Sequence, residues 1–256
     1  MYTMAPIVQL MGGLGNWLFQ IAFAEYLKQF GIYPKLEIGS KSPHSSEEYM
    51  NAVLGAWKSD TLPYDINFDL GRNRFTEERM QPYDWIQIAR SIPNLTITGY
   101  FQNYNYIPPS FFEKLKLPTD SLSRHPGIKE SVFIHIRGGD YVNHPIHDIK
   151  LDNYYDRAIK VFPKKTVFSI FTNDIQYAQS KTFLKEVPHV FVNESEVDSL
   201  YLMSQCSGGI CANSSFSWWG AYLNRARKLI LPSKWYNDAS LFTGGYYFNE
   251  ATVLDV

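Results

Sequence analysis

The chain is poor in cysteine, in net charge and in long apolar runs. Its 256 residues include two cysteines, Cys206 and Cys211, and carry a formal net charge of −1. The spacing of the cysteines fits neither a CxxC pair nor a zinc site, so we expect buried free thiols in a reducing, cytoplasmic compartment. The near-zero charge excludes a global basic field that would recruit nucleic acid. No stretch approaches the ~20 apolar residues of a spanning helix, so we expect a soluble protein without a membrane segment.

The sequence also lacks the patterns that commonly bind a metal ion. It contains no Asp-x-Asp pair, which argues against a divalent-metal clamp on a diphosphate, although single carboxylates can hold Mg²⁺. His144 and His147 lie three positions apart beside Asp148, but histidines on a surface loop are the commoner case. We therefore expect no metal and no cofactor. A diphosphate ligand would have to be held by arginine and by backbone N–H groups.

The chain is rich in aromatic and apolar residues, which follow alternating strand and helix patterns. Apolar residues make up 45% and aromatic residues 16% of the chain, enough for a sizeable core. The alternation predicts parallel α/β sheets with right-handed crossovers. The predicted strands are 7–11, 35–38, 95–98, 132–137, 166–171, 190–192, 209–212 and 228–231. The predicted helices are 17–28, 82–89, 110–115, 153–160, 175–185, 196–206 and 218–225, and residues 39–94 otherwise look irregular. A polar linker at 118–129 divides the chain into halves at 1–125 and 126–256.

One stretch, residues 132–141, combines a strand with charged residues and two glycines. Side chains alternate along a strand, so His135 and Arg137 share one face near its carboxyl end. Gly138 and Gly139 follow and allow a ligand to approach the backbone, and Asp140 lies just beyond. In open α/β sheets, ligands bind outside the carboxyl ends of the strands. A salt-bridged arginine at an ordinary strand end explains the same residues about equally well.

Three predicted strand ends of the second half bring polar groups to one edge of the sheet. The first ends in Arg137, the second is followed by Asp174, and the third by the loop 213–217. Arg137 has the geometry for a bidentate contact with a pyrophosphate. The serine-rich loop precedes a helix whose N–H groups and dipole favour a phosphate. The alternative is that Ser215 or Ser217 merely caps that helix.

Two further features have less specific explanations. The Asp174 carboxylate can accept the N1–H and N2–H₂ donors of guanine, but it can equally be the N-cap of the following helix. The glycine loop at 12–16 lacks both the GxGxxG spacing and the lysine of a P-loop. It could still bring backbone N–H groups to a phosphate.

Taken together in chain order, these motifs resemble a known family. The segments are GGLGN at 12–16, GYFQ at 99–102, HIRGGDY at 135–141, FTND at 171–174, ANSSFSWWGA at 212–221 and LPSKW at 231–235. They span nearly the whole chain and resemble the α-1,2-fucosyltransferase family, glycosyltransferase family 11. The resemblance implies a GT-B-like α/β fold, in which two Rossmann-like halves with parallel sheets face a cleft. The half at 1–125 would be the acceptor side and the half at 126–256 the GDP-sugar donor side.

The resemblance also implies an activity and a set of site residues. The activity is inverting, metal-independent transfer of L-fucose from GDP-fucose to the 2-hydroxyl of a galactose-containing oligosaccharide. Arg137 would hold the diphosphate and Asp174 the guanine. As a separate hypothesis, Asp140 is the base or orients the acceptor hydroxyl, and it could instead only fix His135 or Arg137. The implied donor-binding residues are Gly13, His135, Arg137, Asp174, Asn213, Ser214, Ser215 and Phe216. The acceptor-side candidates are Gln102 and Tyr106.

The chain departs from the family pattern at three positions. Gly138 stands where the family has a second arginine, Trp17 where it has glutamine, and Gly208 where it has histidine. Each departure is expected to remove a polar group near the cleft and to affect the acceptor more than the donor. Two alternatives remain. One is a transferase for another GDP-deoxysugar such as colitose, and the other is a non-catalytic protein that binds a GDP-sugar or a glycan.

Overall fold

The computed structural model describes residues 5–38, 46–62, 71–224 and 228–256. These residues form two compact units, Met1–Leu117 with Ser240–Tyr246 and Pro118–Ala239 with Tyr247–Val256. Residues 118–125, which the sequence analysis placed in the first half, belong to the second unit. The reason is that helix α5 (Ser121–Arg124) contacts the segment before α8 (Glu196–Gln205). Arg124 of α5 donates two hydrogen bonds to Glu194 in that segment.

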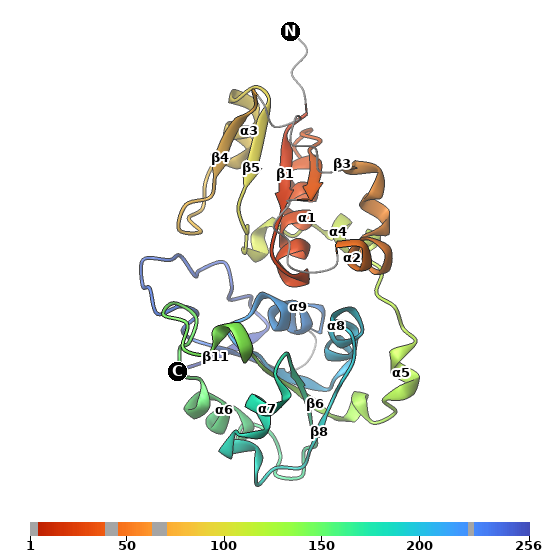
Figure 1. The fold of residues 1–256 in the computed structure, drawn as a ribbon, viewed down its shortest axis with the longest axis vertical. Coiled ribbons are helices and arrows are strands. Elements are labelled where there is room, and N and C mark those ends of the chain that lie inside the picture. Colours follow the sequence, from red (N-terminus) through yellow and green to blue (C-terminus); the bar gives the residue numbers. More distant parts are fainter. Residues whose placement is uncertain (1–4, 39–45, 63–70, 225–227) are drawn as a thin grey trace. The chain divides into compact units, whose positions relative to one another are not determined.

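The first unit contains a parallel sheet with the strand order β3-β2-β1-β5-β4. Its strands are β1 (Ile7–Leu10), β2 (Lys35–Ile38), β3 (Thr61–Leu62), β4 (Asn73–Thr76) and β5 (Leu95–Thr98). Its helices are α1 (Leu14–Lys28), α2 (Ser46–Ala52), α3 (Trp85–Ser91) and α4 (Pro109–Lys114), with 3₁₀ turns at Gly55–Asp60 and Tyr104–Tyr106. Figure 1 shows the central strand β1 with α1 beside it. The central position of β1 means that its loop, 11–13, opens at the middle of the sheet edge.

The second unit contains a parallel sheet with the order β11-β10-β9-β6-β7-β8. Its strands are β6 (Val132–Ile136), β7 (Phe168–Thr172), β8 (His189–Phe191), β9 (Gly208–Ile210), β10 (Lys228–Pro232) and β11 (Ala251–Leu254). Its other helices are α6 (Asp152–Ile159), α7 (Ile175–Gln179) and α9 (Ser215–Leu223), with 3₁₀ turns at Ile128–Glu130, Gly139–Tyr141 and Thr182–Leu184. Helices α6 and α7 cover one face of this sheet, and α8 and α9 cover the other (Figure 1).

The core of the second unit fixes the end of β6. Val132, Ile134 and Ile136 point into an apolar cluster with residues of α6, as the period-2 alternation predicts. In that cluster the Tyr155 hydroxyl donates to the backbone oxygen of His135 at 2.7 Å. Tyr154 donates to the backbone oxygens of Cys211 and Ile230. These buried bonds hold the ends of three neighbouring strands in register.

The predicted α/β class with two parallel sheets is confirmed, and the differences lie in element boundaries. Helix α1 begins at Leu14 rather than Trp17, so part of the glycine loop is helical. In the region 39–94, expected to be mostly irregular, the described residues 46–62 and 71–94 contain the short elements α2, β3 and β4, and residues 39–45 and 63–70 lie outside the described ranges. Strand β11 at the edge of the second sheet was not predicted, because its residues have mixed burial and weak alternation.

Cys206 and Cys211 are both free and buried, as expected, and burial raises the pKa of Cys206 to about 12.

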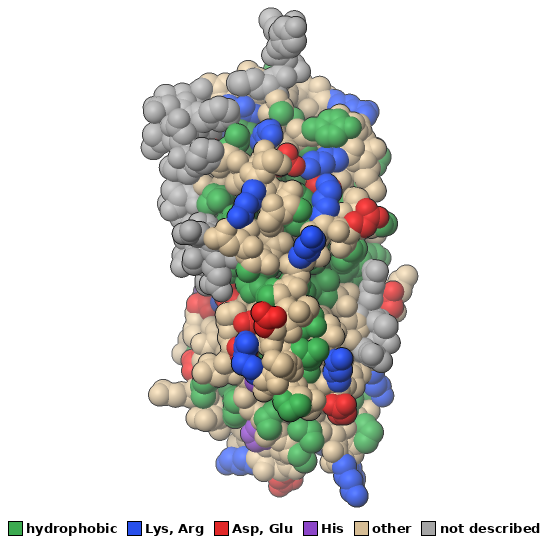
Figure 2. Space-filling model, turned by 90° about the vertical axis from the view of Figure 1, so that its right-hand side faces the viewer, with side chains coloured by type: hydrophobic (Ala, Val, Ile, Leu, Met, Phe, Trp, Pro, Cys, Tyr) green, Lys and Arg blue, Asp and Glu red, His purple; other side chains and the backbone are tan. Residues whose placement is uncertain are grey.

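Among the described helices, none has the length and apolar character needed to span a membrane. On the face that Figure 2 shows, basic and acidic side chains are interspersed with polar and apolar ones.

Candidate active site

The carboxyl edge of the second sheet collects the residues that the sequence analysis singled out. Strands β9, β6 and β7 are neighbours and run parallel. Their ends therefore lie on one edge, and they lead into Arg137, Asp174 and the loop before α9. This convergence, predicted from the order of strands and helices, gives the site its backbone frame.

Arg137 combines one occupied and one unoccupied hydrogen-bonding group. Its Nη2 atom lies 2.8 Å from Oδ1 of Asp140, and its guanidinium lies over the ring of Tyr141, 5.1 Å from the centroid. Its buried Nε atom has no hydrogen-bond partner among the described residues. The Asp140 side chain is 62% exposed, so this ion pair orients Arg137 rather than neutralising it in a dry environment. Arg137 thus retains a donor for an anionic ligand.

His135 is buried beneath this edge and is neutral at physiological pH. Burial, and secondarily the charge of Arg137, lower the pKa of His135 to about 3. Its ring packs against Phe216 with 5.5 Å between centroids, and its Nδ1 atom is buried without a partner in the described chain. His135 can therefore give a ligand a neutral hydrogen bond but no positive charge.

The loop after Arg137 is clamped by the loop after β7. The Gly138 N–H donates to Oδ1 of Asn173 at 2.9 Å, and the Gly139 N–H donates to Oδ2 of Asp174 at 3.2 Å. The other oxygen of Asp174 accepts the N–H of Tyr177 at 2.9 Å and caps α7. The N-cap interpretation of Asp174 is therefore confirmed. The same side chain also fixes the position of the glycine loop that carries Arg137.

The missing second arginine has a steric reason in this clamp. A Cβ atom at Gly138 would lie 2.7 Å from Cβ of Asp174 and 2.9 Å from Cδ1 of Tyr177. Any larger residue at position 138 would have to displace the clamp. This departure does lie at the carboxyl edge, as expected.

The other two departures do not lie at an open site, contrary to expectation. Trp17 is fully buried in the first unit and packs edge-on against Tyr49, with 5.5 Å between centroids. Gly208 begins β9, at the amino-terminal edge of the second sheet. A Cβ atom there would lie 2.7 Å from the backbone oxygen of Lys228. Packing explains Trp17, and close contact between strands explains Gly208.

The serine-rich loop forms the N-terminus of α9 without a side-chain cap. Ser214 is the N-cap residue, and its hydroxyl makes no capping bond. The Ser217 hydroxyl donates to the backbone oxygen of Ser214 at 3.3 Å, so it does not cap the helix amides either. Asn213 donates to the backbone oxygens of His147 and Trp235, both at 2.9 Å, and so braces the loop. The first N–H groups of α9, from Ser215 onward, therefore receive no side-chain oxygen from the described residues and suit an anion.

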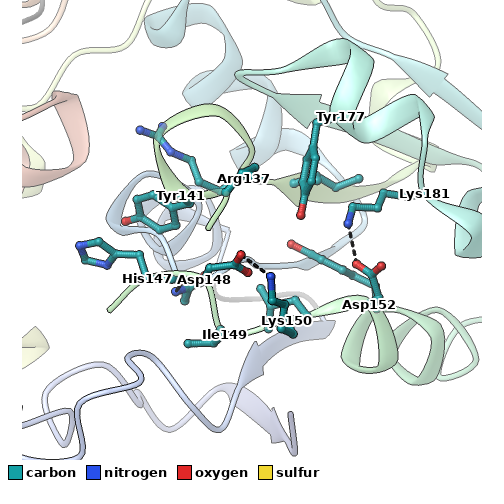
Figure 3. A pocket seen from close by; sticks show the side chains of 14 residues that line it. Arg137, Tyr141, His147, Asp148, Ile149, Lys150, Asp152, Tyr177 and Lys181 are labelled. Atoms are coloured by element: carbon teal, nitrogen blue, oxygen red, sulfur yellow. Dashed lines mark hydrogen bonds and ion pairs between the residues drawn. The ribbon is translucent and has the colours of Figure 1, made fainter. Parts of the chain in front are cut away.

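A pocket opens beside these residues within the second unit (Figure 3). Figure 3 shows the rings of Tyr141 and Tyr177 on its wall, with Lys181 paired to Asp152 and Lys150 paired to Asp148. The Lys181 Nζ atom lies 4.0 Å from the centroid of the Tyr177 ring. The pocket thus brings aromatic surface and charges of both signs to the carboxyl edge of the second sheet.

Sequence reasoning missed most of these pocket residues. They lie in loops and at helix starts, where no periodic pattern marks them. Asn173 and Tyr177 flank Asp174 closely in sequence, so their position directly after a strand end was the available signal. The pairing of Lys181 with Asp152 joins positions far apart in the chain and has no local signature.

The carboxyl edge of the first sheet holds the remaining predicted residues. Gly13 is the N-cap residue of α1, where its backbone oxygen accepts the N–H of Asn16. Gln102 donates to Oδ1 of Asn16 at 2.6 Å and accepts a hydrogen bond from the Tyr246 hydroxyl. The amide of Gln102 thus links three segments of the first unit. Tyr106 is 9% exposed in an aromatic cluster with Phe23, so packing accounts for its position.

Comparison with known proteins adds to this geometry. Residues 101–248 match Glycosyl transferase family 11. An α-1,2-colitosyltransferase of Escherichia coli is 27% identical over 92% of this chain and 93% of its own length. The O-antigen biosynthesis glycosyltransferase WbnK of Escherichia coli is 34% identical over 45% of this chain, and the match spans only 43% of that relative.

Solved structures bear on the fold. The ADP-heptose LPS heptosyltransferase II of Escherichia coli superposes with a TM-score of 0.52 at 12% identity, covering 98% of this chain and 90% of its own. At this level of identity the likeness concerns the fold alone, and it agrees with the GT-B-like class of two parallel α/β sheets. The family match covers more than half of the chain and includes Arg137, the clamp and the N-terminus of α9. The chain therefore belongs to glycosyltransferase family 11.

Proposed function

We propose that this glycosyltransferase moves L-fucose from GDP-fucose to the 2-hydroxyl of a galactose-containing acceptor, with inversion and without a required metal ion. One observation carries the donor part of the proposal. The unpaired Nε of Arg137 and the uncapped N-terminus of α9 belong to one edge of the second sheet. A diphosphate is the common ligand that suits both groups.

The nucleotide base and ribose lie against the rings of Tyr141 and Tyr177, which line the pocket of Figure 3. Arg137 and the N–H groups of Ser215 and Phe216 hold the diphosphate, and Asp140 keeps the guanidinium in place. His135 is neutral, since its pKa is lowered to about 3, and its unpartnered Nδ1 offers a hydrogen bond from below. The donor is thus bound by the second unit.

In the reaction, the bond between the sugar's anomeric carbon and the diphosphate oxygen breaks, and GDP leaves with the electron pair. The acceptor hydroxyl oxygen forms the new bond on the opposite face, and its proton passes to a base. The transition state resembles an oxocarbenium ion, as in other glycosyl chemistry. Negative charge grows on the diphosphate, where Arg137 and the helix N-terminus stabilise it.

The test replaces Arg137 and measures transfer from GDP-fucose to lactose. We expect R137A to lower kcat/KM by about 10²–10³, the usual cost of removing one such contact. R137K should recover only part of the rate, because lysine lacks the planar fork of donors. The matched control is R90A, which removes an exposed arginine of the first unit. Wild-type rates in R137A would refute the donor assignment, and loss of transfer in EDTA would refute metal independence.

A second donor sugar is favoured by one relative. The α-1,2-colitosyltransferase aligns with almost the whole chain, and colitose differs from fucose by lacking the 3-hydroxyl group. Assays with GDP-fucose and GDP-colitose in parallel decide between them by the ratio of their kcat/KM values. GDP-sugar binding without turnover on a panel of galactosides would instead support the non-catalytic alternative.

A further inference from the structure

The first unit contains a carboxylate with no role in the scheme above. Glu77 directly follows β4, and its backbone N–H donates to the backbone oxygen of Thr98 at 2.8 Å. It therefore lies at the carboxyl edge of the first sheet, beside the end of β5. This is the same edge that carries Gly13 and Gln102.

The two oxygens of Glu77 have different surroundings. Oε2 accepts the N–H of Tyr100 at 2.8 Å and the N–H of Phe101 at 3.0 Å. Oε1 has no hydrogen bond or ion pair with any residue in the described ranges. Burial raises the pKa of Glu77, and the two N–H bonds oppose this effect without cancelling it. One oxygen thus fixes the side chain, while the other keeps its lone pairs for a ligand.

The backbone around Glu77 is held in uncommon conformations. Phe101 is fully buried with φ +49°, and Arg79 and Met80 have φ +51° and +57°. Residues other than glycine adopt this region at a cost, and such residues cluster at functional sites. A Cβ atom at Gly99 would lie 2.6 Å from Cβ and 2.9 Å from Oε2 of Glu77, so the Glu77 side chain packs directly on this glycine.

Polar groups that could orient a sugar lie in the same cluster. The Tyr246 hydroxyl contacts Sδ of Met80 at 3.5 Å and donates to the amide of Gln102. Gln102 follows Phe101 directly and donates to Asn16. The loop of Glu77 and the loop of Gln102 are thus joined through one tyrosine within the first unit.

We propose that Glu77 is the general base that removes the proton from the acceptor hydroxyl. This inference rests on the proposed transfer reaction. The hydroxyl hydrogen passes to Oε1, the oxygen of that hydroxyl forms the bond to the anomeric carbon, and GDP leaves with the electrons of the broken bond. Asp140 then acts as a positioning residue, because it is mostly exposed and paired with Arg137.

The decisive variant is E77Q, in which the amide oxygen can still accept both backbone N–H groups. We expect kcat to fall by about 10²–10⁴, the contribution typical of general-base catalysis. The dissociation constant of GDP-fucose should stay within about twofold of the wild-type value, because the second unit binds the donor. The matched control is E78Q, which neutralises the exposed neighbouring carboxylate and should leave kcat unchanged.

A pH profile separates a base from a structural anchor. The base must be deprotonated, so wild-type kcat/KM should fall as the pH drops through the pKa of Glu77, which lies above its ordinary value. E77Q should lose this acidic limb. The titratable neighbour Tyr106 is buried and its pKa is raised above 10.0, so it stays neutral across the profile.

The possible outcomes are distinct. Wild-type kcat in E77Q, or an unchanged acidic limb, would show that Glu77 only anchors the turn and would overturn the inference, while the proposed function would stand. If the wild-type protein transfers no sugar and releases no GDP with any acceptor, the proposed function fails, and the inference fails with it.

Discussion

Asp174 receives a backbone N–H on each of its carboxylate oxygens, from Tyr177 on Oδ1 and from Gly139 on Oδ2. A carboxylate oxygen has two lone-pair sites, so these bonds leave acceptor capacity for the N1–H and N2–H₂ groups of guanine. Bracing the loop and reading the base are therefore separate roles of one side chain. The two roles can be separated by changing the nucleotide, because only the contact with the base depends on its 2-amino group.

We predict that the D174N variant loses the protein's preference for GDP over IDP, a nucleotide that lacks the 2-amino group. A hydrogen bond to a charged group contributes about 1.5–3 kcal/mol, so the affinity for GDP, which makes both contacts, should fall by about tenfold more than that for IDP, which keeps only the N1–H contact. Isothermal titration with both nucleotides measures the ratio.

The matched control for this prediction is N173A. It removes the bond to the Gly138 N–H without touching the proposed base contact, so it should weaken GDP and IDP binding equally. Equal weakening in D174N as well would show that Asp174 only braces the loop and caps α7.

The residues whose roles the sequence indicated lie at strand ends, and those it misplaced lie on a helix or between strands. Strand alternation placed His135 at the end of β6 and Arg137 directly after it, because the strand pattern depends only on local backbone geometry. It gave no information on Trp17, which is one of the buried residues of α1. The steric role of Gly138 depends on Tyr177, a contact that only the folded loops create.

At the scale of elements, α1 is buried over most of its surface, including the acidic side chain of Glu25. Glu25 is 2% exposed and accepts hydrogen bonds from Trp57 at 2.8 Å, Lys28 at 2.7 Å and Lys114 at 2.8 Å. Burial acts to raise the pKa of Glu25, but the hydrogen bonds from Lys114, Lys28 and Trp57 outweigh it and lower the pKa. This carboxylate joins α1 to α4 and to the turn at Gly55–Asp60.

We predict that E25Q lowers the free energy of unfolding by about 2–3 kcal/mol at pH 7. This is less than the roughly 3–5 kcal/mol of a fully buried pair, because both lysines reach solvent. The lowered pKa means that the stabilisation is present above the ordinary range of a glutamate and is lost as the pH falls through the folded-state pKa. Urea unfolding at pH 7 and in acid should therefore show a difference that shrinks in acid.

The control is K35Q, which removes the weaker, more exposed pair of Lys35 with Asp60 at 3.6 Å. It should cost less than about 1 kcal/mol. A difference between wild type and E25Q that persists in acid would contradict the electrostatic explanation.

The elements that the sequence predicted well are those with a clear period, such as β1, β6 and β7. The missed elements are short: β3 has 2 residues and α2 has 7. Elements of this length depend on neighbouring strands for their stability, so local sequence carries little signal for them.

At the scale of the whole molecule, the chain returns to its first unit near its end. The segment Ser240–Tyr246 belongs to that unit, where Tyr104 donates its N–H to the backbone oxygen of Gly245 at 3.0 Å. A single domain boundary predicted from the sequence cannot describe this arrangement, because the contacts that place Ser240–Tyr246 in the first unit join residues far apart in the chain. The return supplies Tyr246 to the cluster that holds Gln102.

This division gives the last prediction, which assigns each ligand to one unit. With GDP alone, hydrogen exchange should slow at amides of the second unit that bind the nucleotide, in residues 137–142 and 214–217. Ligand binding stabilises the state that binds it, and only amides whose opening breaks the ligand contacts share fully in that stabilisation. Addition of lactose should then slow exchange in residues 77–81 and 99–104 of the first unit. R137A should abolish the first effect at the same GDP concentration, whereas E77Q should leave it intact. Protection by GDP confined to the first unit would mean that the donor and acceptor units have been assigned the wrong way round.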